Sequence, residues 1–201
     1  MRCRLFVFLV LAVSIFTVTV PAFSQVAPAY ETKGGWPISL GIGPSSYNVD
    51  LGHDRMLGGT IWVDFYPEKL PHILRGLGVE GEARVISLNG SSTPPSVQRQ
   101  ETVGAGPIYA WHHFHNFHPY FKYLIAYGSM DFNIGSPTYT HDTRTLSAPG
   151  GGFEYRFYRQ FWARADYEYQ TWQTLFGKTF RPQGFTVGVA YDFAHPIPKR
   201  Q

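Results

Sequence analysis

The sequence predicts an all-β protein: a closed, antiparallel, up-and-down barrel of eight strands that spans a membrane, preceded by a cleavable signal peptide. Three observations predict this fold. The chain begins with a basic and then apolar leader, the remainder shows period-two alternation without helical periodicity, and its connections alternate between long and short. The 201 residues are enough for one domain or two small ones, and we find no linker or internal repeat.

Composition excludes several classes of protein. An aromatic content of 17% is too high for a disordered chain, and a mean hydropathy of −0.17 excludes a bundle of membrane helices. The formal net charge is +3, but Arg2 and Arg4 in the leader supply two of the cations. The remainder is nearly neutral, so we expect no binding to nucleic acid.

The leader has the three parts of a secretory signal peptide. A basic start precedes the apolar run 5–20, and small residues follow before Gln25, so we predict a signal peptide over 1–24. Cleavage after Ala29 and an uncleaved anchor are the alternatives. The only cysteine, Cys3, precedes the apolar run, so the mature chain would lack disulfides and must be stabilised by its own packing or its environment.

The mature chain divides into a short periplasmic segment over 25–35, the barrel over 36–193 and a tail over 194–201. The clearest strand is 161–172, whose even positions carry four polar groups between two tryptophans, while no odd position is charged. Similar alternation predicts eight strands in total, at about 36–48, 57–66, 77–85, 102–112, 120–132, 152–157, 161–172 and 184–193.

The connections between these strands predict a barrel with two unlike ends. The long connections, rich in Gly, Ser, Pro and Thr, fall near 49–56, 90–101, 133–145 and 173–183, and the mostly shorter ones fall near 67–76, 113–119 and 158–160. Pro107 lies within the fourth strand and has no N–H to donate, so we expect a β-bulge there.

The charged face of the strands carries both signs close together. In a membrane barrel this face lines the lumen, where mixed charges can pair, and an unpaired buried charge would cost several kcal/mol. The opposite face is rich in Phe, Tyr, Val and Ala, with aromatic residues near strand ends, as in the girdles of membrane barrels. The predicted lumen network comprises Asp64, Glu80, Glu82, Arg84, Lys122, Glu154, Arg156, Arg164, Asp166 and Glu168.

Three segments and the last strand carry a family resemblance. They are Gly78–Arg84, Pro119–Lys122 with Ala126–Gly128, Trp162–Tyr169 and Gly188–Phe193. Over roughly 36–193 the chain resembles the small outer-membrane β-barrel proteins of Gram-negative bacteria, the OmpA-like and OmpX-like eight-stranded group. The resemblance implies an insertion signal at Gly188, Tyr191 and Phe193, read by the barrel-assembly machinery with the help of periplasmic chaperones. The chain departs from the family pattern, in which the sequence usually ends at this Phe, because residues 194–201 follow Phe193.

Four of the eight histidines lie in one tract. His112, His113, His115 and His118 are the candidate metal ligands, because imidazole is a common ligand of transition metals. Their spacing matches no defined site and no carboxylate accompanies them, so we predict a polar turn and no metal. No phosphate loop or nucleophile elbow occurs, and we expect no catalytic residue and no cofactor.

We therefore expect a non-enzymatic, monomeric integral protein of the outer membrane, in contact with its lipid and lipopolysaccharide. Side chains would fill its polar lumen, and it would contribute to envelope integrity or make surface contacts through its long loops. Alternation alone leaves open a soluble secreted or periplasmic ligand-binding barrel, lipocalin-like in shape. A lipid A-modifying enzyme that uses His53 or His141 in the long loops is a further, weaker alternative.

Overall fold

The computed structural model describes residues 37–49, 55–67, 70–71, 74, 76–88, 96–111, 116–133, 140–175 and 178–193. The expected signal peptide 1–24, the segment 25–35 and the tail 194–201 lie outside the described residues. Within the described part of the chain, no helix is both long and apolar enough to cross a bilayer.

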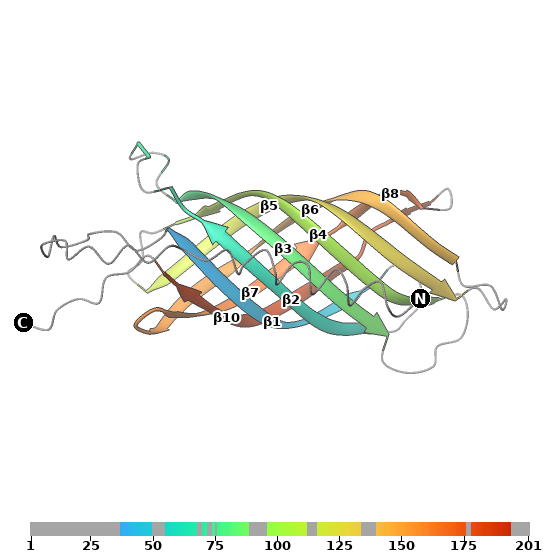
Figure 1. Ribbon diagram of the computed structural model, residues 1–201, viewed down its shortest axis with the longest axis horizontal. Helices are drawn as coiled ribbons and strands as arrows, with labels where there is room; N and C mark the ends of the chain where they lie inside the picture. Colours follow the sequence, from blue (N-terminus) through green and yellow to red (C-terminus); the bar gives the residue numbers. More distant parts are fainter. Residues whose placement is uncertain are drawn as a thin grey trace, which may run out of the picture. The chain divides into compact units, whose positions relative to one another are not determined.

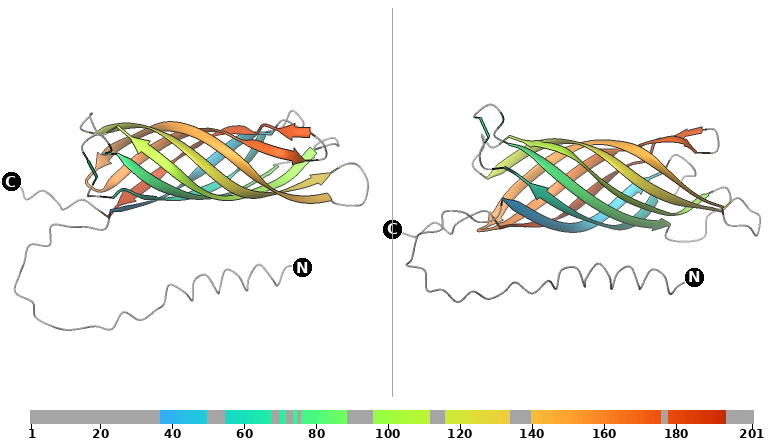
Figure 2. Two further views of the ribbon diagram at one scale, coloured as in Figure 1. Left: turned by 90° about the horizontal axis from the view of Figure 1, so that it is seen from above. Right: turned by 45° about the horizontal axis from the view of Figure 1, so that its top comes forward.

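Over these described ranges, ten β-segments form one sheet, and the pairing of β5 with β6 closes it into a barrel (Figures 1 and 2). Every pairing is antiparallel. The segments are β1 (Ile38–Asn48), β2 (Arg55–Phe65), β3 (Leu77–Leu88), β4 (Ser96–Ala110), β5 (Phe117–Asn133), β6 (Thr140–Tyr158), β7 (Phe161–Tyr169), β8 (Thr171–Leu175), β9 (Lys178–Phe180) and β10 (Gln183–Asp192).

The ten segments make eight barrel strands, because two strands are each interrupted once. β7 and β8 are separated only by Gln170 and pair with β6 in one register. β9 and β10 are separated by Arg181 and Pro182, and the Gln170 N–H donates to the Pro182 carbonyl at 2.7 Å across this point. The predicted closed, antiparallel, eight-stranded barrel is therefore confirmed.

The two ends of the barrel differ. At the turn end, on the left in Figure 1, β1 begins and β10 ends, and the Phe193 N–H donates to the Ile38 carbonyl at 3.0 Å. β2, β4 and β6 also finish at this end and β3, β5 and β7 begin there. Arg159, between β6 and β7, has a positive φ of 40°. The opposite end, where β1, β3, β5 and β8 finish, is called the loop end below.

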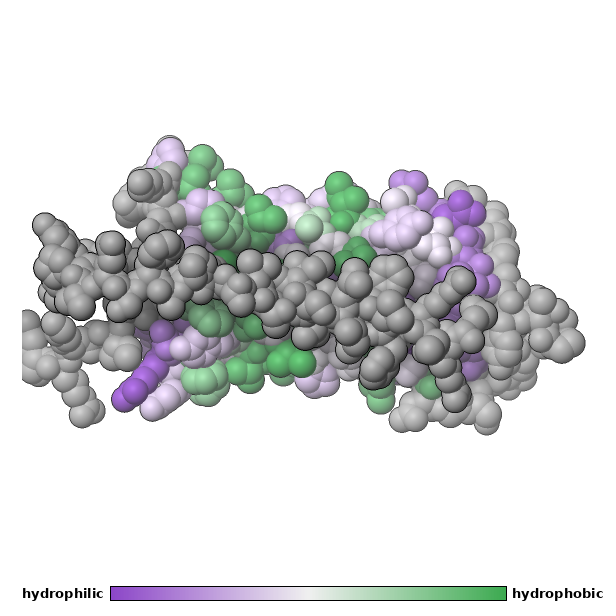
Figure 3. All heavy atoms as spheres, in the orientation of Figure 1, coloured by the Kyte–Doolittle hydropathy of each residue, from purple (hydrophilic) through white to green (hydrophobic). Residues whose placement is uncertain are grey.

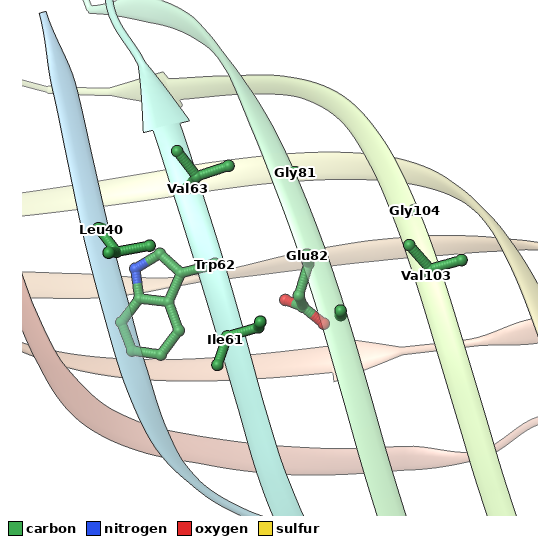
Figure 4. Close-up of a pocket in the computed structure, with 9 residues that line it drawn as sticks. Leu40, Ile61, Trp62, Val63, Gly81, Glu82, Val103 and Gly104 are labelled. Carbon is green, nitrogen blue, oxygen red and sulfur yellow. The ribbon is translucent and has the colours of Figure 1, made fainter. Parts of the chain in front are cut away.

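The outer surface of the barrel is apolar over much of its height (Figure 3). On β2, Ile61 and Val63 are 51% and 41% exposed, while Trp62 between them is buried (Figure 4). The same alternation runs around the barrel. The exposed side chains include Leu40, Ile42, Leu57, Val79, Val85, Val103, Phe121, Tyr123, Ile125, Tyr127, Phe153, Tyr155, Phe157, Tyr167, Phe185, Val187 and Val189.

A shallow apolar groove crosses this outer surface at the centre of Figure 4. The small residues Gly81 and Ala83 of β3 lie along it, with Leu40, Ile61 and Val63 on one side and Val103 on the other. The groove follows from the pleat, since the side chains that would fill it are a hydrogen atom and a methyl group.

Two strands are longer at the loop end than the sequence predicts. β4 begins at Ser96 and β6 at Thr140, inside the stretches 90–101 and 133–145 that we expected to be connections. In these extensions the outward side chains are polar, as at Glu101 and His141, and Figure 3 shows hydrophilic surface gathered at the loop end, on the right. The expected strand starts were wrong because these polar stretches resemble loops in composition.

The interior of the barrel changes character along its axis. Towards the loop end its side chains form an apolar plug, and the expected polar, side-chain-filled part of the lumen lies on the turn-end side of this plug. In the loop-end part of the barrel the interior is therefore apolar and the outer surface polar, as in a soluble barrel. The plug consists of Tyr47, Val49, Met56, Ile86, Val97, Leu124, Ala126, Met130, Phe132, Leu146, Ala148, Trp172 and Phe180.

The bulge expected at Pro107 is absent, because Pro107 pairs in register with Val79. Its side chain is exposed on the outer surface of β4. The register shift on β4 falls instead between Val97 and Arg99, in the extension beyond the apolar part of the strand.

Candidate functional site: the charged lumen

Among the residues that the structure describes, nine charged side chains are buried inside the barrel, and all nine belong to the predicted network. They come from inward positions of β2, β3, β5, β6 and β7, so residues far apart in sequence meet because the sheet closes. Each is at most 9% exposed: Asp64, Glu80, Glu82, Arg84, Lys122, Glu154, Arg164, Asp166 and Glu168.

Lys122 lies at the centre of this network. Its Nζ is 2.8 Å from Glu80 Oε1 and 2.6 Å from Glu82 Oε2. The same Nζ is 2.6 Å from Asp166 Oδ2 and 3.3 Å from Glu168 Oε2. A lysine ammonium has three donors, so four surrounding carboxylates satisfy it fully and compensate for its removal from water.

Arg164 connects the network towards the turn end. It donates to Glu80 Oε2 at 2.5 Å and to Asp166 Oδ2 at 3.1 Å, and it reaches Asp64 Oδ2 at 3.3 Å. Its Nε donates to the Tyr120 hydroxyl at 2.7 Å. The guanidinium also lies 4.8 Å from the centre of the Trp62 ring and 4.5 Å from that of Tyr120, so π-faces contribute to its binding.

Arg84 connects the network towards the loop end. It donates to both carboxylate oxygens of Glu168, at 2.7 and 3.2 Å, and pairs with Glu82. Its Nε donates to Thr60 Oγ1 at 3.0 Å, and it lies 4.2 Å from the centre of the Tyr47 ring. Tyr47 belongs to the apolar plug, so Arg84 marks the boundary between the charged and apolar parts of the interior.

A layer of neutral polar groups continues this boundary. Gln170 donates to Glu168 Oε1 at 2.9 Å, and its own Oε1 accepts from Gln100 at 2.6 Å and from the indole N–H of Trp172 at 2.9 Å. Trp172 is itself part of the plug. The interior therefore passes from ions to amides to hydrocarbon, and each polar layer is hydrogen-bonded to the next.

Glycines on the inward face make room for the large side chains of the network. A Cβ atom at Gly41 would overlap the Trp62 ring. A Cβ atom at Gly150 would lie 3.0 Å from Cε of Lys122, closer than side chains normally approach. An eight-stranded barrel is just wide enough to be filled by side chains, so long inward residues must face small ones.

The structure places Arg156 outside this network. Arg156 is only partly buried at the turn end, where it donates to Asn116 Oδ1 at 3.0 Å and lies 5.5 Å from the centre of the Trp162 ring. It has the inward phase of its strand, but it lies two residues nearer the turn end than Glu154. Strand alternation predicts the face of a residue but not its depth.

Of the candidate metal ligands, His112, His113 and His115 lie outside the described residues. His118 stacks on Trp162 with 4.6 Å between ring centres. Elsewhere, His141 of the loop end has its Nδ1 2.6 Å from Asp131 Oδ1 and its Nε2 3.2 Å from Thr143 Oγ1. The side chain of His141 is 60% exposed, as expected for a residue on the polar outer surface.

Sequence reasoning missed the uncharged members of the site. A buried hydroxyl cluster links Ser45 to Thr60 at 2.5 Å and to Thr186 at 2.8 Å. The aromatic partners Tyr47, Trp62 and Tyr120 were also missed. All of these residues lie at positions of their strands whose side chains point into the barrel. The period-two alternation could therefore have identified them, if it had been applied to polar and aromatic residues as well as to charged ones.

Tyr66, just beyond β2, covers the turn end of the interior. It packs against the buried cluster of Ile108, Ala110 and Tyr120. Burial, followed by the negative charge of Asp64, raises the pKa of the Tyr66 phenol well above its ordinary value, so this group is neutral.

The geometry of the site supports a structural role for the charged network. Among the described residues, three carboxylates could together hold a metal ion, those of Glu80, Glu82 and Asp166, and the Lys122 ammonium lies among their oxygens. The plug then follows along the axis. The network is therefore arranged as a structural core of ions.

A family model matches most of this chain. The model described as outer membrane protein beta-barrel domain matches residues 9–193. The chain belongs to this family. The resemblance inferred from the sequence is thereby confirmed, and the apolar outer surface of this outer-membrane barrel is the surface that faces lipid.

Solved structures show the same fold at low sequence identity. Neisserial surface protein A is 14% identical with a TM-score of 0.59, and the match covers 78% of this chain and 96% of that one. Ail, the attachment invasion locus protein of Yersinia pestis, is 18% identical with a TM-score of 0.56 over 78% and 97%. The N-terminal barrel domain of Pseudomonas aeruginosa OprF is 19% identical with a TM-score of 0.50 over 78% and 99%. A search of curated proteins gave no significant match.

Proposed function

We propose that this chain is an exported, non-enzymatic, monomeric integral protein of the outer membrane. Its closed barrel would contribute to envelope integrity or make surface contacts through the connections at its loop end. One observation carries the proposal: in the described part of the chain, apolar side chains cover the outside of the barrel, while nine charged side chains are buried inside it. A soluble ligand-binding barrel would have the reverse arrangement.

The height of the apolar surface supports insertion in an outer membrane. On β2 the outward side chains are apolar or glycine from Leu57 to Phe65, and Arg55 follows at the loop end. At about 3.3 Å per residue and a tilt of roughly 40°, this stretch spans about 23 Å, close to the ~25 Å apolar band of such barrels. The loop end would then lie outside the cell and the turn end in the periplasm.

Surface contact is supported by the extended strands and by the names of similar proteins. β4, β5 and β6 continue beyond the apolar band, so they would raise the loop end above the membrane surface. Among the structural neighbours, one is named a surface protein and another an attachment invasion locus protein. Contact with lipopolysaccharide at the polar boundary is part of the same proposal.

Cell fractionation tests the proposed location. The protein should fractionate with outer membrane and, after detergent extraction, migrate differently on gels before and after boiling. N-terminal sequencing should find Gln25 first if residues 1–24 are a cleaved signal peptide. Recovery in the soluble periplasmic fraction, without a heat-dependent shift, would refute membrane insertion.

The proposed insertion signal can be tested separately from the fold. The Tyr191 ring packs on Phe193 with 4.8 Å between centres, and its hydroxyl donates to Gln160 at 2.5 Å. Phe193→Ala should slow assembly in cells but leave spontaneous folding into detergent micelles nearly unchanged, if the assembly machinery reads this residue. Equal losses in both assays would show that Phe193 acts through packing alone.

A further inference from the structure

Two arginines lie on the outer surface of the loop end, where β10, β1 and β2 are side by side (Figure 1). Arg55 begins β2, Arg181 directly precedes Pro182 and β10, and both side chains are exposed. Asn48 of β1 lies between them, because it pairs with Arg55 on one side and with Gln183 on the other. We call Arg55, Asn48, Gln183 and Arg181 the arginine face.

The arginine face differs in charge from the outer surface of β4–β6. In the part of the chain that the structure describes, neither Arg55 nor Arg181 forms an ion pair. On β4, by contrast, the outward Arg99 pairs with Glu101, and on β5 and β6 the outward Asp131 contacts His141. The described outward charges at the loop end of β10, β1 and β2 are therefore positive and available to an anion.

The two arginines lie at the upper boundary of the apolar band. Leu57 of β2 and Phe185 of β10, on the same outer face, are 48% and 56% exposed below them. Strands are about 4.8 Å apart and rise about 3.3 Å per residue, so the Cα atoms of Arg55 and Arg181 are roughly 12 Å apart across the sheet. Two cationic side chains thus face the level at which acyl chains give way to headgroups.

We propose that the arginine face binds one lipopolysaccharide molecule through the two phosphates of its lipid A headgroup; this rests on the outer-membrane location proposed above. Lipid A carries a phosphate at each end of a disaccharide, and two arginines at this separation can each contact one. Guanidinium groups bind phosphate oxygens bidentately and stay charged at any physiological pH. The acyl chains would then lie along Leu57 and Phe185.

The residues between the arginines suit a sugar. Gln183 Oε1 accepts a hydrogen bond from the Tyr167 hydroxyl at 2.6 Å, which orients the carboxamide of Gln183 on the outer surface. Its amide group and that of Asn48 would bind hydroxyl groups of the disaccharide. An anionic phospholipid has a single phosphate and no sugar ring of this kind, so it would contact only one arginine.

The test uses the full chain folded into detergent micelles, with the heat-dependent gel shift as the check of folding. Native mass spectrometry with increasing lipopolysaccharide gives stoichiometry and affinity. We expect one molecule per barrel, with an affinity that falls as salt is added. Arg55→Gln or Arg181→Gln should weaken binding about fivefold, and both together about twentyfold or more. Arg99→Gln is the matched control and should bind like the wild type.

Removal of phosphate from the lipid tests the same contacts on the unchanged protein. Lipopolysaccharide that lacks one lipid A phosphate should bind the wild type about fivefold more weakly. The double variant should no longer distinguish the two lipids. Phosphatidylglycerol and inorganic phosphate, at the same concentration as the lipopolysaccharide, should not displace it.

Three results would overturn the proposal. They are equal binding by the wild type and the folded double variant, equal binding of the lipids with one and two phosphates, and displacement by phosphatidylglycerol or inorganic phosphate, which would indicate a general anion surface. If the double variant does not fold, the comparison of the two lipids on the wild type decides. A wild type without a heat-dependent shift would instead refute the proposed membrane barrel, so the two failures are distinguishable.

Discussion

At the scale of single residues, Arg164 combines ion pairs, a hydrogen bond and two aromatic faces in one buried position. Arg164→Met should lower the free energy of unfolding by about 3–5 kcal/mol, because the carboxylates it now contacts would lose their partner. The measurement is urea unfolding of the folded barrel, followed by the heat-dependent gel shift.

Arg99 provides the matched control for this prediction. It pairs with Glu101 on the outer surface of the loop end, and its side chain is 45% exposed. Arg99→Met should cost at most about 1 kcal/mol, since exposed ion pairs contribute little. Similar losses for both arginines would contradict the idea that burial gives the network its importance.

A pair of glycines tests the packing of the lumen. Gly41→Val should destabilise the barrel by about 1–3 kcal/mol, because the new side chain would overlap Trp62. Gly59→Val should have little effect, since an added Cβ atom there meets only the Gly43 carbonyl oxygen, at 3.9 Å. Thermal unfolding of both variants makes the comparison, and a tolerated valine at position 41 would indicate a loosely packed interior.

The sequence predicted every charged residue of the site that the structure describes, and Arg156 in addition, because ions on one strand face are a clear pattern. It could not show which of them are deep: Glu154 is buried and Arg156, two residues later, is not. It also gave no sign that Lys122, the only cation of β5 with the inward phase, would lie at the centre. Depth and mutual position depend on how strands are staggered around the barrel, and stagger arises from pairing between distant segments.

At the scale of strands, β10 crosses from the apolar band to the polar loop end. Val187 is 58% exposed within the band, and Gln183, four residues away on the same face, lies towards the loop end. Val187→Arg should cost about 2–4 kcal/mol in a phospholipid bilayer, and Gln183→Arg about 0–1 kcal/mol. Folding equilibria in liposomes provide the measurement, and equal costs would mean that the band does not end between these residues.

The eight strands were predictable because their membrane portions alternate clearly, but the starts of β4 and β6 were not. In the extension of β4, Arg99 and Glu101 face outward while Val97 is buried. In the extension of β6, His141 and Thr143 face outward and Leu146 is buried, while the charged Asp142 and Arg144 alternate with them and are not buried. Where a strand extends beyond the membrane, its outer face becomes polar. The alternation of apolar outward and polar inward residues therefore ends at that point of the sequence, although the strand pairing continues. The start of the last strand was also predicted too late, at 184. Pro182 has no N–H to donate to the sheet, and it separates β9 from β10 within this strand.

At the scale of the whole molecule, two layers close the lumen in series. The ion network lies on the turn-end side of the apolar plug, and Arg84 and Gln170 connect the two. We predict that planar-bilayer recordings of the wild type show no stable nanosiemens steps. Trp172→Gly, which removes the largest plug side chain, should also give none, because the ion network remains. Stable steps from the wild type would contradict a closed barrel.

The central claim, that apolar side chains face lipid while the charged ones are enclosed, is tested most directly with single cysteines. A chain that starts at Gln25 has no cysteine of its own. Spin labels at Val63 and Val187 should be relaxed by oxygen dissolved in the bilayer and not by a water-soluble nickel complex, whereas a label at Gln183 should respond to the nickel complex. Labels at Val63 and Val187 that respond to the nickel complex as strongly as the label at Gln183 would contradict the account.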